Sequence, residues 1–549
     1  MRSAIPLAFL VCGSLVACAP AAAVGPKASV TSAAQPNAAP GEPLHWADLD
    51  NATLERARRE KKYVLLDGAA EWCHWCHVME ATTYHDPAVR KILDAHFIAV
   101  KVDVDARPDV LERYGDWGWP ATILFAPDAT EIGKYRGYIP PEKLVTILEE
   151  VVRSGVAEGA SPAAQDKPIK APKRALEEEH LAWIQHAIDV ELDDYWDDKQ
   201  GGWGRGQKAP IGGNNAWTLW KAERGDAEAK RKGLFTLDQQ AKLLDPVWGG
   251  IYQYSAAGHW DEPHFEKLMT FQAPAIENYA IAYRVTKDPK QLDRAKKMVG
   301  YVDRFLKSPE TGGFFTTQDA DVNAHDRSKK FVDGHDYYPL GEKERLARGV
   351  PRIDDHEYAK ENGLAIAAYV TMYEVTRDPN ILASAEKAAH RILDSHKHEK
   401  WAGVTHDVAD APRSQKQLFL ADNASFGFAL LRLYEVTKNE EWAKRAKAIA
   451  DFMLAELQDD DGGGFFAATK DPDAFGVFSG RRVPVEDNVT ALRLLARLAR
   501  TSTDPKYKVA IDRTLRAVAT PEAIKTRGRW LGDYLLALEE TKGVRGLLR

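Results

Sequence analysis

The chain has 549 residues, of which 44% are apolar, 28% charged and 9% aromatic, so it can bury a sizeable core and is neither wholly disordered nor collagen-like. Its 74 basic and 81 acidic residues give a formal charge of −7, and no basic stripe is present, so no nucleic-acid partner is expected. The length exceeds that of one ordinary domain.

The amino terminus resembles a secretory signal. Residues 5–17 form an apolar run after Arg2, too short for a membrane-spanning helix, which needs about 20 residues. The run ends Leu15-Val16-Ala17-Cys18, which resembles a bacterial lipobox in which Cys18 becomes the lipidated first residue. We therefore expect a lipoprotein signal peptide at 1–18 and a lipid-anchored protein of the bacterial cell envelope, facing the periplasm in a double-membraned cell. The alternatives are a plain signal peptide cut near Ala21 or a short anchor.

The next segment, 19–43, is rich in Ala, Pro, Gly and Ser, which predicts a flexible tether. Two of the four cysteines, Cys12 and Cys18, belong to the signal, and Cys73 and Cys76 form a single C-x-x-C. A Cys₄ zinc site would need a second such pair, and disulfide stabilisation would use several pairs. The pattern favours redox chemistry, with no metal and no cofactor expected. A structural disulfide, or a metal site with His74 or His77, remains the alternative.

A first domain is expected at 44–154. Its apolar patterns predict a helix at 54–62, a strand at 63–67, a helical region from Cys73 to about Ala95, strands at 97–104, 119–125 and 131–136, and a closing helix at 141–152. Strands that alternate with helices predict an α/β domain.

Several residues of this domain resemble the thioredoxin family in register over about 110 residues: Ala70-Glu71-Trp72-Cys73 as the active-site lead-in, Asp67 six residues before the first cysteine, Lys101 at the position of a buried lysine, and Pro120 at that of the cis-proline. The resemblance implies a thioredoxin fold. The backbone at Trp119–Pro120 would then present a strand edge to an incoming disulfide-bearing segment.

The active-site chemistry follows from these positions. Cys73 would begin a helix, where free N–H groups and the helix dipole stabilise a thiolate, and Cys76 would be the resolving thiol. His74 can add positive charge near the thiolate. Asp67 would be a buried proton acceptor for Cys76. His77 is expected on the helix surface or as a cap. A protein or small-molecule disulfide or thiol would be the partner.

A linker is expected at 155–175, and beyond it helix-period patterns dominate 176–549. Twelve helices are predicted, at 177–196, 214–223, 227–243, 266–285, 289–307, 361–376, 379–396, 422–437, 439–457, 486–500, 504–518 and 529–541. One turn recurs at 283–289, 373–379 and 434–439, and a glycine-aromatic loop recurs at 201–203, 249–252, 312–315 and 463–466. Short turns at one end and long loops at the other predict an all-α, six-hairpin (α/α)₆ toroid with a pocket on the loop face.

The motifs of both domains together resemble the DUF255 family, the thioredoxin-domain proteins related to spermatogenesis-associated protein 20. The residues that carry the resemblance are 72–80, 201–204, 208–210, Trp260 with 263–267, and 318–321. The resemblance implies a thioredoxin domain fused to a six-hairpin, glycosidase-like barrel akin to sugar epimerases. The run 322–340 departs from the family's usual continuation, which puts shared barrel chemistry in doubt.

Six residues are candidates for the barrel pocket: Trp260, His264, Glu266, Asp319, Asp321 and Asp422. Sugar hydrolysis uses two carboxylates about 5–10 Å apart, and His264 suits an epimerase-type base. The same residues could instead cap loops.

The favoured function is an exported thiol–disulfide oxidoreductase whose barrel binds or selects the substrate. One alternative is a carbohydrate-active barrel enzyme with an accessory thioredoxin domain and a sugar ligand. The other is a non-catalytic interaction protein of the cell envelope.

Overall fold

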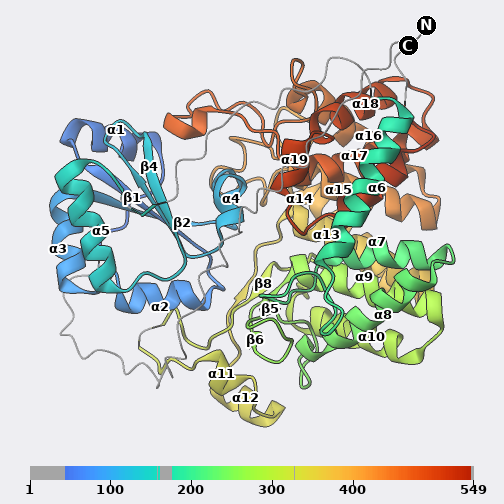
Figure 1. Ribbon diagram of the computed structural model, residues 1–549, viewed down its shortest axis with the longest axis horizontal. Helices are drawn as coiled ribbons and strands as arrows, with labels where there is room; N and C mark the ends of the chain where they lie inside the picture. The colour runs from blue at the N-terminus through green and yellow to red at the C-terminus, as the bar shows by residue number, and fades with distance from the viewer. Residues whose placement is uncertain (1–43, 158, 161–175, 327, 546–549) are drawn as a thin grey trace, which may run out of the picture. The chain divides into compact units, whose positions relative to one another are not determined.

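The computed structural model describes residues 44–157, 159–160, 176–326 and 328–545 (Figure 1). The expected signal at 1–18 and tether at 19–43 lie outside the described residues, as does most of the expected linker. Within the described ranges, no helix combines the length and apolar character needed to cross a membrane. The two folded domains belong to one compact unit.

The first domain is built on a four-stranded sheet in the order β2-β1-β3-β4. Strand β1 (Tyr63–Ala69) lies parallel to β2 (Phe97–Asp103) and antiparallel to β3 (Ala121–Phe125), which pairs with β4 (Glu131–Arg136). Apolar side chains are buried on both faces of β1 and β3 because helices cover the sheet. The expected α/β thioredoxin-like fold is confirmed.

Five helices accompany this sheet: α1 (Asn51–Glu60), α2 (His74–Thr82), α3 (Pro87–His96), α4 (Pro108–Tyr114) and α5 (Pro141–Ser154). The region expected to be helical from Cys73 to about Ala95 is two helices. It breaks where Asp86 accepts hydrogen bonds from the first turn of α3 and Pro87 takes the first helical position. Helix α4 was not anticipated, and it faces the second domain.

The second domain is a closed ring of six inner helices: α7 (Gly212–Glu223), α9 (Met269–Thr286), α13 (Ala359–Thr376), α15 (Leu420–Thr437), α17 (Val485–Thr501) and α20 (Gly532–Thr541). Each inner helix contacts the next, and α20 contacts α7. Six further helices pair with them: α6 (Glu178–Tyr195), α8 (Ala227–Gln240), α10 (Pro289–Phe305), α14 (Pro379–Ser395), α16 (Glu440–Phe452) and α18 (Lys506–Val518) (Figure 1). The expected (α/α)₆ architecture is confirmed.

Burial separates the two rings. Inner helix α13 is buried around nearly its whole circumference, whereas outer helix α14 buries only the stripe Ala385, Ala388, Ala389 and Ile392. That i, i+3, i+4, i+7 spacing marks one helix face packed against a partner and one facing solvent. The hydrophobic core therefore lies between the rings.

The repeated turns and loops have a regular structure. Lys287, Arg377 and Lys438 adopt left-handed conformations at helix ends, and the next residue caps the following helix. At the opposite end, loops close by backbone bridges between residues seven apart: 196 with 203, 244 with 251, 307 with 314, 397 with 404, and 458 with 465. The loop at 397–404 lacks the Gly-Gly signature, which is why the sequence pattern missed it.

Loop strands position the candidate site. The strands β7 (Lys267–Leu268), β8 (Thr317–Gln318) and β9 (Ile353–Asp354) form a small sheet in which Lys267 pairs with Gln318. Helix α9 therefore begins at Met269, not at the expected residue 266. This pairing brings Glu266 next to Asp319, although Lys267 and Gln318 are 51 positions apart in the chain.

Candidate active site

Cys73 caps the amino terminus of α2 and forms a disulfide with Cys76. The Cys76 backbone N–H donates to the Cys73 sulfur at 3.2 Å, as a helix-capping group requires. Both cysteines are buried, while Trp75 between them is exposed. The oxidised pair therefore occupies the helix start that the sequence indicated.

The peptide bond between Trp119 and Pro120 is cis, as the family resemblance implied. The Trp119 ring lies against Gly68, where an added Cβ would come within 2.8 Å of the ring. Only glycine fits there, so Gly68 fixes the position of Trp119 on the surface beside Cys73.

Asp67 is buried in the central strand β1, where its backbone pairs with Lys101 on one side and Thr122 on the other. Burial raises the pKa of the Asp67 carboxyl to about 7. This effect outweighs the nearby Lys101 charge and the hydrogen bond that the Tyr84 hydroxyl donates to Asp67 at 3.2 Å, both of which lower the pKa. Such a group can exchange a proton near neutral pH. Lys101 differs from expectation: its side chain is 33% exposed and pairs with Glu80.

Loops of the barrel close over His74. The His74 Nδ1 donates to Asp321 at 2.8 Å, and its backbone N–H donates to Glu266 at 3.4 Å. Burial opposes the charge of His74, but the hydrogen bond and charge of Asp321 outweigh it and raise the His74 pKa to about 9. His74 is therefore a cation next to the cysteine pair.

The small sheet thus brings the expected pocket residues to the Cys-His-Trp-Cys helix. His264, Glu266 and Asp321 line a cavity of about 10 Å³ together with His74. Burial raises the Glu266 pKa to about 7 and lowers the His264 pKa to about 4, so His264 is neutral. These residues converge on the cysteine motif and not on the centre of the barrel.

Two residues lie elsewhere than expected. Trp260 lines neither described cavity: its ring is fully buried and its Nε1 donates to the Gln200 carbonyl at 2.8 Å. His77 is not a surface residue, because its Nδ1 donates to Asp321 at 3.2 Å and its ring is largely buried. Spacing within α2 places His77 one turn from His74, but nothing local reveals the acidic loop opposite.

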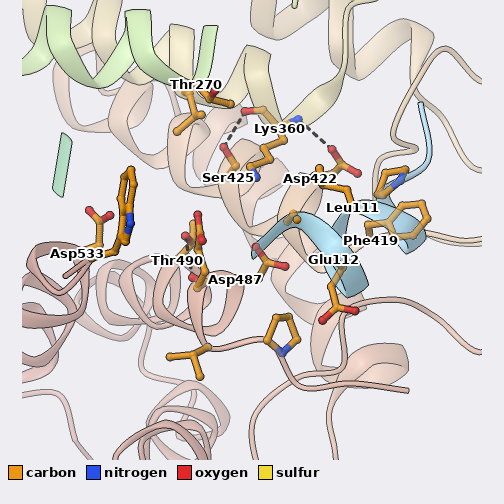
Figure 2. Close-up of a pocket in the computed structure, with 18 of the residues that line it drawn as sticks. Leu111, Glu112, Thr270, Lys360, Phe419, Asp422, Ser425, Asp487, Thr490 and Asp533 are labelled. Carbon is orange, nitrogen blue, oxygen red and sulfur yellow. Dashed lines mark hydrogen bonds between the residues drawn. The ribbon is translucent and has the colours of Figure 1, made fainter. Parts of the chain in front are cut away.

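A large cavity of about 1820 Å³ extends from the boundary between the two domains into the interior of the barrel. The first domain contributes Cys73, Trp75 and Trp119 to its lining. Figure 2 shows part of the barrel lining together with Leu111 and Glu112 of α4. The cysteine motif and the barrel interior therefore line the same cavity.

Lys360 contributes a positive charge to this part of the cavity (Figure 2). Its Nζ has no hydrogen-bond or ion-pair partner among the residues that the structure describes, and its backbone is held by Asp422 and Ser425 at 3.0 and 2.9 Å. Burial opposes the charge, but the surrounding carboxylates, led by those of Glu486 and Asp487, raise the Lys360 pKa.

Two carboxyl groups that line the cavity, those of Asp487 and Asp422, have different surroundings. Burial raises the Asp487 pKa to about 7 despite the nearby Lys360 charge. Of the six expected pocket residues, Glu266 and Asp422 line this cavity. The Asp422 carboxylate accepts a hydrogen bond from His406 Nδ1 at 3.1 Å. The other ring nitrogen of His406, Nε2, donates to the Asp105 carbonyl of the first domain at 2.8 Å. Sequence patterns gave no signal for Lys360, Asp487 or His406, because each sits in an ordinary helix or loop sequence.

Comparison with known proteins agrees with this architecture. Residues 35–156 match the family model described as "Protein of unknown function, DUF255", and residues 344–475 match the model of Glycosyl Hydrolase Family 88. Human spermatogenesis-associated protein 20 is 27% identical over 317 residues, which cover 51% of this chain and 39% of the human one. The chain therefore combines a DUF255-type thioredoxin-like domain with a barrel similar to glycoside hydrolases.

Two further similarities concern single domains of this protein. The thiol:disulfide interchange protein DsbD 1 of Pseudomonas aeruginosa is 33% identical over 134 residues, or 23% of this chain and 21% of that protein. A crystal structure of D-mannose isomerase has a TM-score of 0.50 at 11% identity and covers 66% of this chain and 97% of that one. The second similarity concerns the barrel fold alone.

Proposed function

We propose that this protein is an exported thiol–disulfide oxidoreductase whose barrel holds the substrate beside Cys73. The observation that carries the proposal is the shared cavity: Cys73 and Trp119 line the same space as Lys360 and Asp487 of the barrel. A substrate bound among the barrel side chains would extend to the cysteine pair without leaving the protein.

The exchange step uses the residues in fixed roles. In the reduced protein the Cys73 thiolate attacks one sulfur of a substrate disulfide, forming a mixed disulfide and releasing the other substrate sulfur as a thiolate. Cys76, deprotonated with the help of Asp67, then attacks the Cys73 sulfur. This restores the Cys73–Cys76 disulfide and frees the reduced substrate. The reverse sequence oxidises a dithiol, and the two reduction potentials set the direction.

The cavity indicates the size and character of the substrate. Its volume of about 1820 Å³ exceeds the roughly 300–1,000 Å³ of a pocket for a drug-sized ligand. Its lining includes the unpaired ammonium of Lys360, the carboxyl group of Asp487 and the hydroxyl group of Thr490. A polar segment of a larger molecule fits such a space better than a small apolar ligand does.

A carbohydrate ligand is the second candidate, and Asp487 favours it. A carboxyl with a pKa near 7 can stay protonated and act as a general acid, which glycoside cleavage requires. Incubation with a panel of oligosaccharides tests this function: turnover by the unmodified chain that Asp487→Asn abolishes would support it. Absence of turnover in both proteins would remove it.

The anchoring part of the proposal rests on the sequence Leu15-Val16-Ala17-Cys18. A lipid on Cys18 would hold the protein at a membrane of the cell envelope, with 19–43 as the tether. Disulfide chemistry suits an exported protein because disulfides persist outside the cytosol.

Equilibration of the full-length chain in glutathione buffers of graded ratio tests the redox activity. We expect a single two-electron transition of the Cys73–Cys76 pair, read from alkylated peptides by mass spectrometry. Cys73→Ala should abolish it, and Cys12→Ser, outside the motif, should leave it unchanged. A disulfide that glutathione neither reduces nor forms would overturn the proposal.

A further inference from the structure

Four donor atoms meet beside the cysteine motif, at Glu71, His77, Asp319 and His325. The Nε2 atoms of His77 and His325 lie 3.0 and 2.8 Å from the Glu71 carbonyl oxygen. The same two nitrogens lie 3.6 and 3.2 Å from the Asp319 Oδ2. Two imidazole nitrogens therefore face the same pair of oxygens.

These separations match the edges of a metal-centred tetrahedron. Zinc holds nitrogen and oxygen ligands at about 2.0–2.2 Å, which places neighbouring ligand atoms of a tetrahedron about 3.3–3.6 Å apart. Of the four separations, 3.6 Å lies at the upper end of that range, and 3.2, 3.0 and 2.8 Å lie below it. Binding of an ion needs only small outward movements of the donors.

The surrounding groups orient these donors as the outer shell of a metal site does. The other ring nitrogen of His77 donates to Asp321 at 3.2 Å, so a neutral His77 can turn an Nε2 lone pair toward an ion that replaces the Nε2 hydrogen bond to the Glu71 carbonyl. The other carboxylate oxygen of Asp319 accepts the Asp321 backbone N–H at 2.8 Å. Carboxylate–histidine–metal arrangements have this form.

The remaining clusters are less suited to an ion. His74 directs one ring nitrogen at Asp321 and the other toward Asp333 at 3.9 Å, and a single ring cannot aim both nitrogens at one ion. Asp354, Asp355 and His356 are consecutive residues with only one of the three buried. The His77 cluster is the better enclosed, with side chains of His77 and Asp319 that are 9% and 2% exposed.

We propose that His77, Asp319 and His325, with the Glu71 carbonyl oxygen, form a site for a divalent transition metal of the zinc class. The ion would join α2 of the thioredoxin domain to the barrel loop after β8. His325, whose side chain is 35% exposed, gives the ion a route from solvent.

No local motif announces this site. Its ligands come from residues 71, 77, 319 and 325, in two domains, whereas zinc motifs in sequences bring ligands within a few residues of each other.

Zinc binding to the full-length chain tests the site. The protein is kept oxidised, so that the cysteine sulfurs stay in their disulfide, freed of metal with a chelator and titrated with Zn²⁺ by calorimetry. We expect a single equivalent to bind and to survive dialysis. His325→Ala should lose the ion or bind it at least about tenfold more weakly.

Two control variants sharpen the test. His335→Ala removes an exposed histidine of the nearby helix α11 (Gly334–Tyr337), and Glu71→Gln changes a side chain while keeping the carbonyl, so both variants should bind zinc as the unmodified chain does. Co²⁺ in the site should show the intense visible absorption of tetrahedral coordination, and Asp319→Asn should weaken it. No retained zinc, or equal binding by His325→Ala and the unmodified chain, would overturn the proposal.

Discussion

Replacement of Asp67 by asparagine should change the pH dependence of stability in a defined direction. Burial raises the Asp67 pKa from 3.8 to about 7, so the folded chain keeps its proton where the unfolded chain has lost it. Stability is therefore lost as pH rises from about 4 to about 7 and is constant above that window. The difference corresponds to about 4 kcal/mol at most.

Asp67→Asn removes this titration but keeps an oxygen that accepts from Tyr84. We expect the variant to be more stable than the unmodified protein at pH 8, by up to about 4 kcal/mol, and close to it at pH 4. Hydrogen exchange of the β1 amides in urea measures the thioredoxin domain separately from the barrel. Disulfide exchange should slow, because Cys76 loses its proton acceptor.

Asp128 provides a control, because its pKa is shifted in the opposite direction to that of Asp67. Its pKa is lowered by hydrogen bonds from Thr130, so Asp128→Asn should lose a little stability at neutral pH and gain none. The same dependence of the unfolding free energy on pH in Asp67→Asn and the unmodified protein, or lower stability of Asp67→Asn at pH 8, would contradict this role of Asp67.

Two further predictions concern anchoring and the barrel core. Cys18→Ser should release the protein from membranes or block its processing, and unchanged fractionation would refute the lipoprotein hypothesis. Asp245 is fully buried and holds Lys267 and Arg345, each at 2.7 Å, so Asp245→Ala leaves two buried cations and should cost about 3–5 kcal/mol in urea unfolding. The exposed Asp293→Ala should change stability by less than about 0.5 kcal/mol, and equal effects of the two would contradict the role of burial.

The architecture could be predicted largely from local patterns. All twelve long barrel helices lie in segments predicted to be helical, and the repeated turn ending in a capping Asp or Asn marked three of the connections between them. Asp67 and Pro120 were found because the thioredoxin motif fixes their spacing from the cysteines. Errors occurred where a proline or a short strand overrode the helical pattern, at Pro87 and at Lys267–Leu268.

The candidate site could be predicted only in part. The segments containing Glu266 and Asp321 were expected to meet, and they do, but around His74 and not in a sugar-binding pocket. His74 and Asp321 are 247 residues apart, and their contact depends on how the two domains pack. No periodicity encodes such a contact, so Lys360 and Asp487 were missed for the same reason.

Capture of a substrate in cells by Cys76→Ala, which lacks the resolving thiol, tests whether the barrel presents substrates to Cys73. We expect mixed disulfides on Cys73 whose yield falls when Lys360→Ala is added. Glutathione should still exchange with the cysteine pair of the Lys360→Ala single variant as it does with the unmodified protein. Equal capture with and without Lys360 would contradict the role of the barrel cavity, and no capture at all would contradict the oxidoreductase itself.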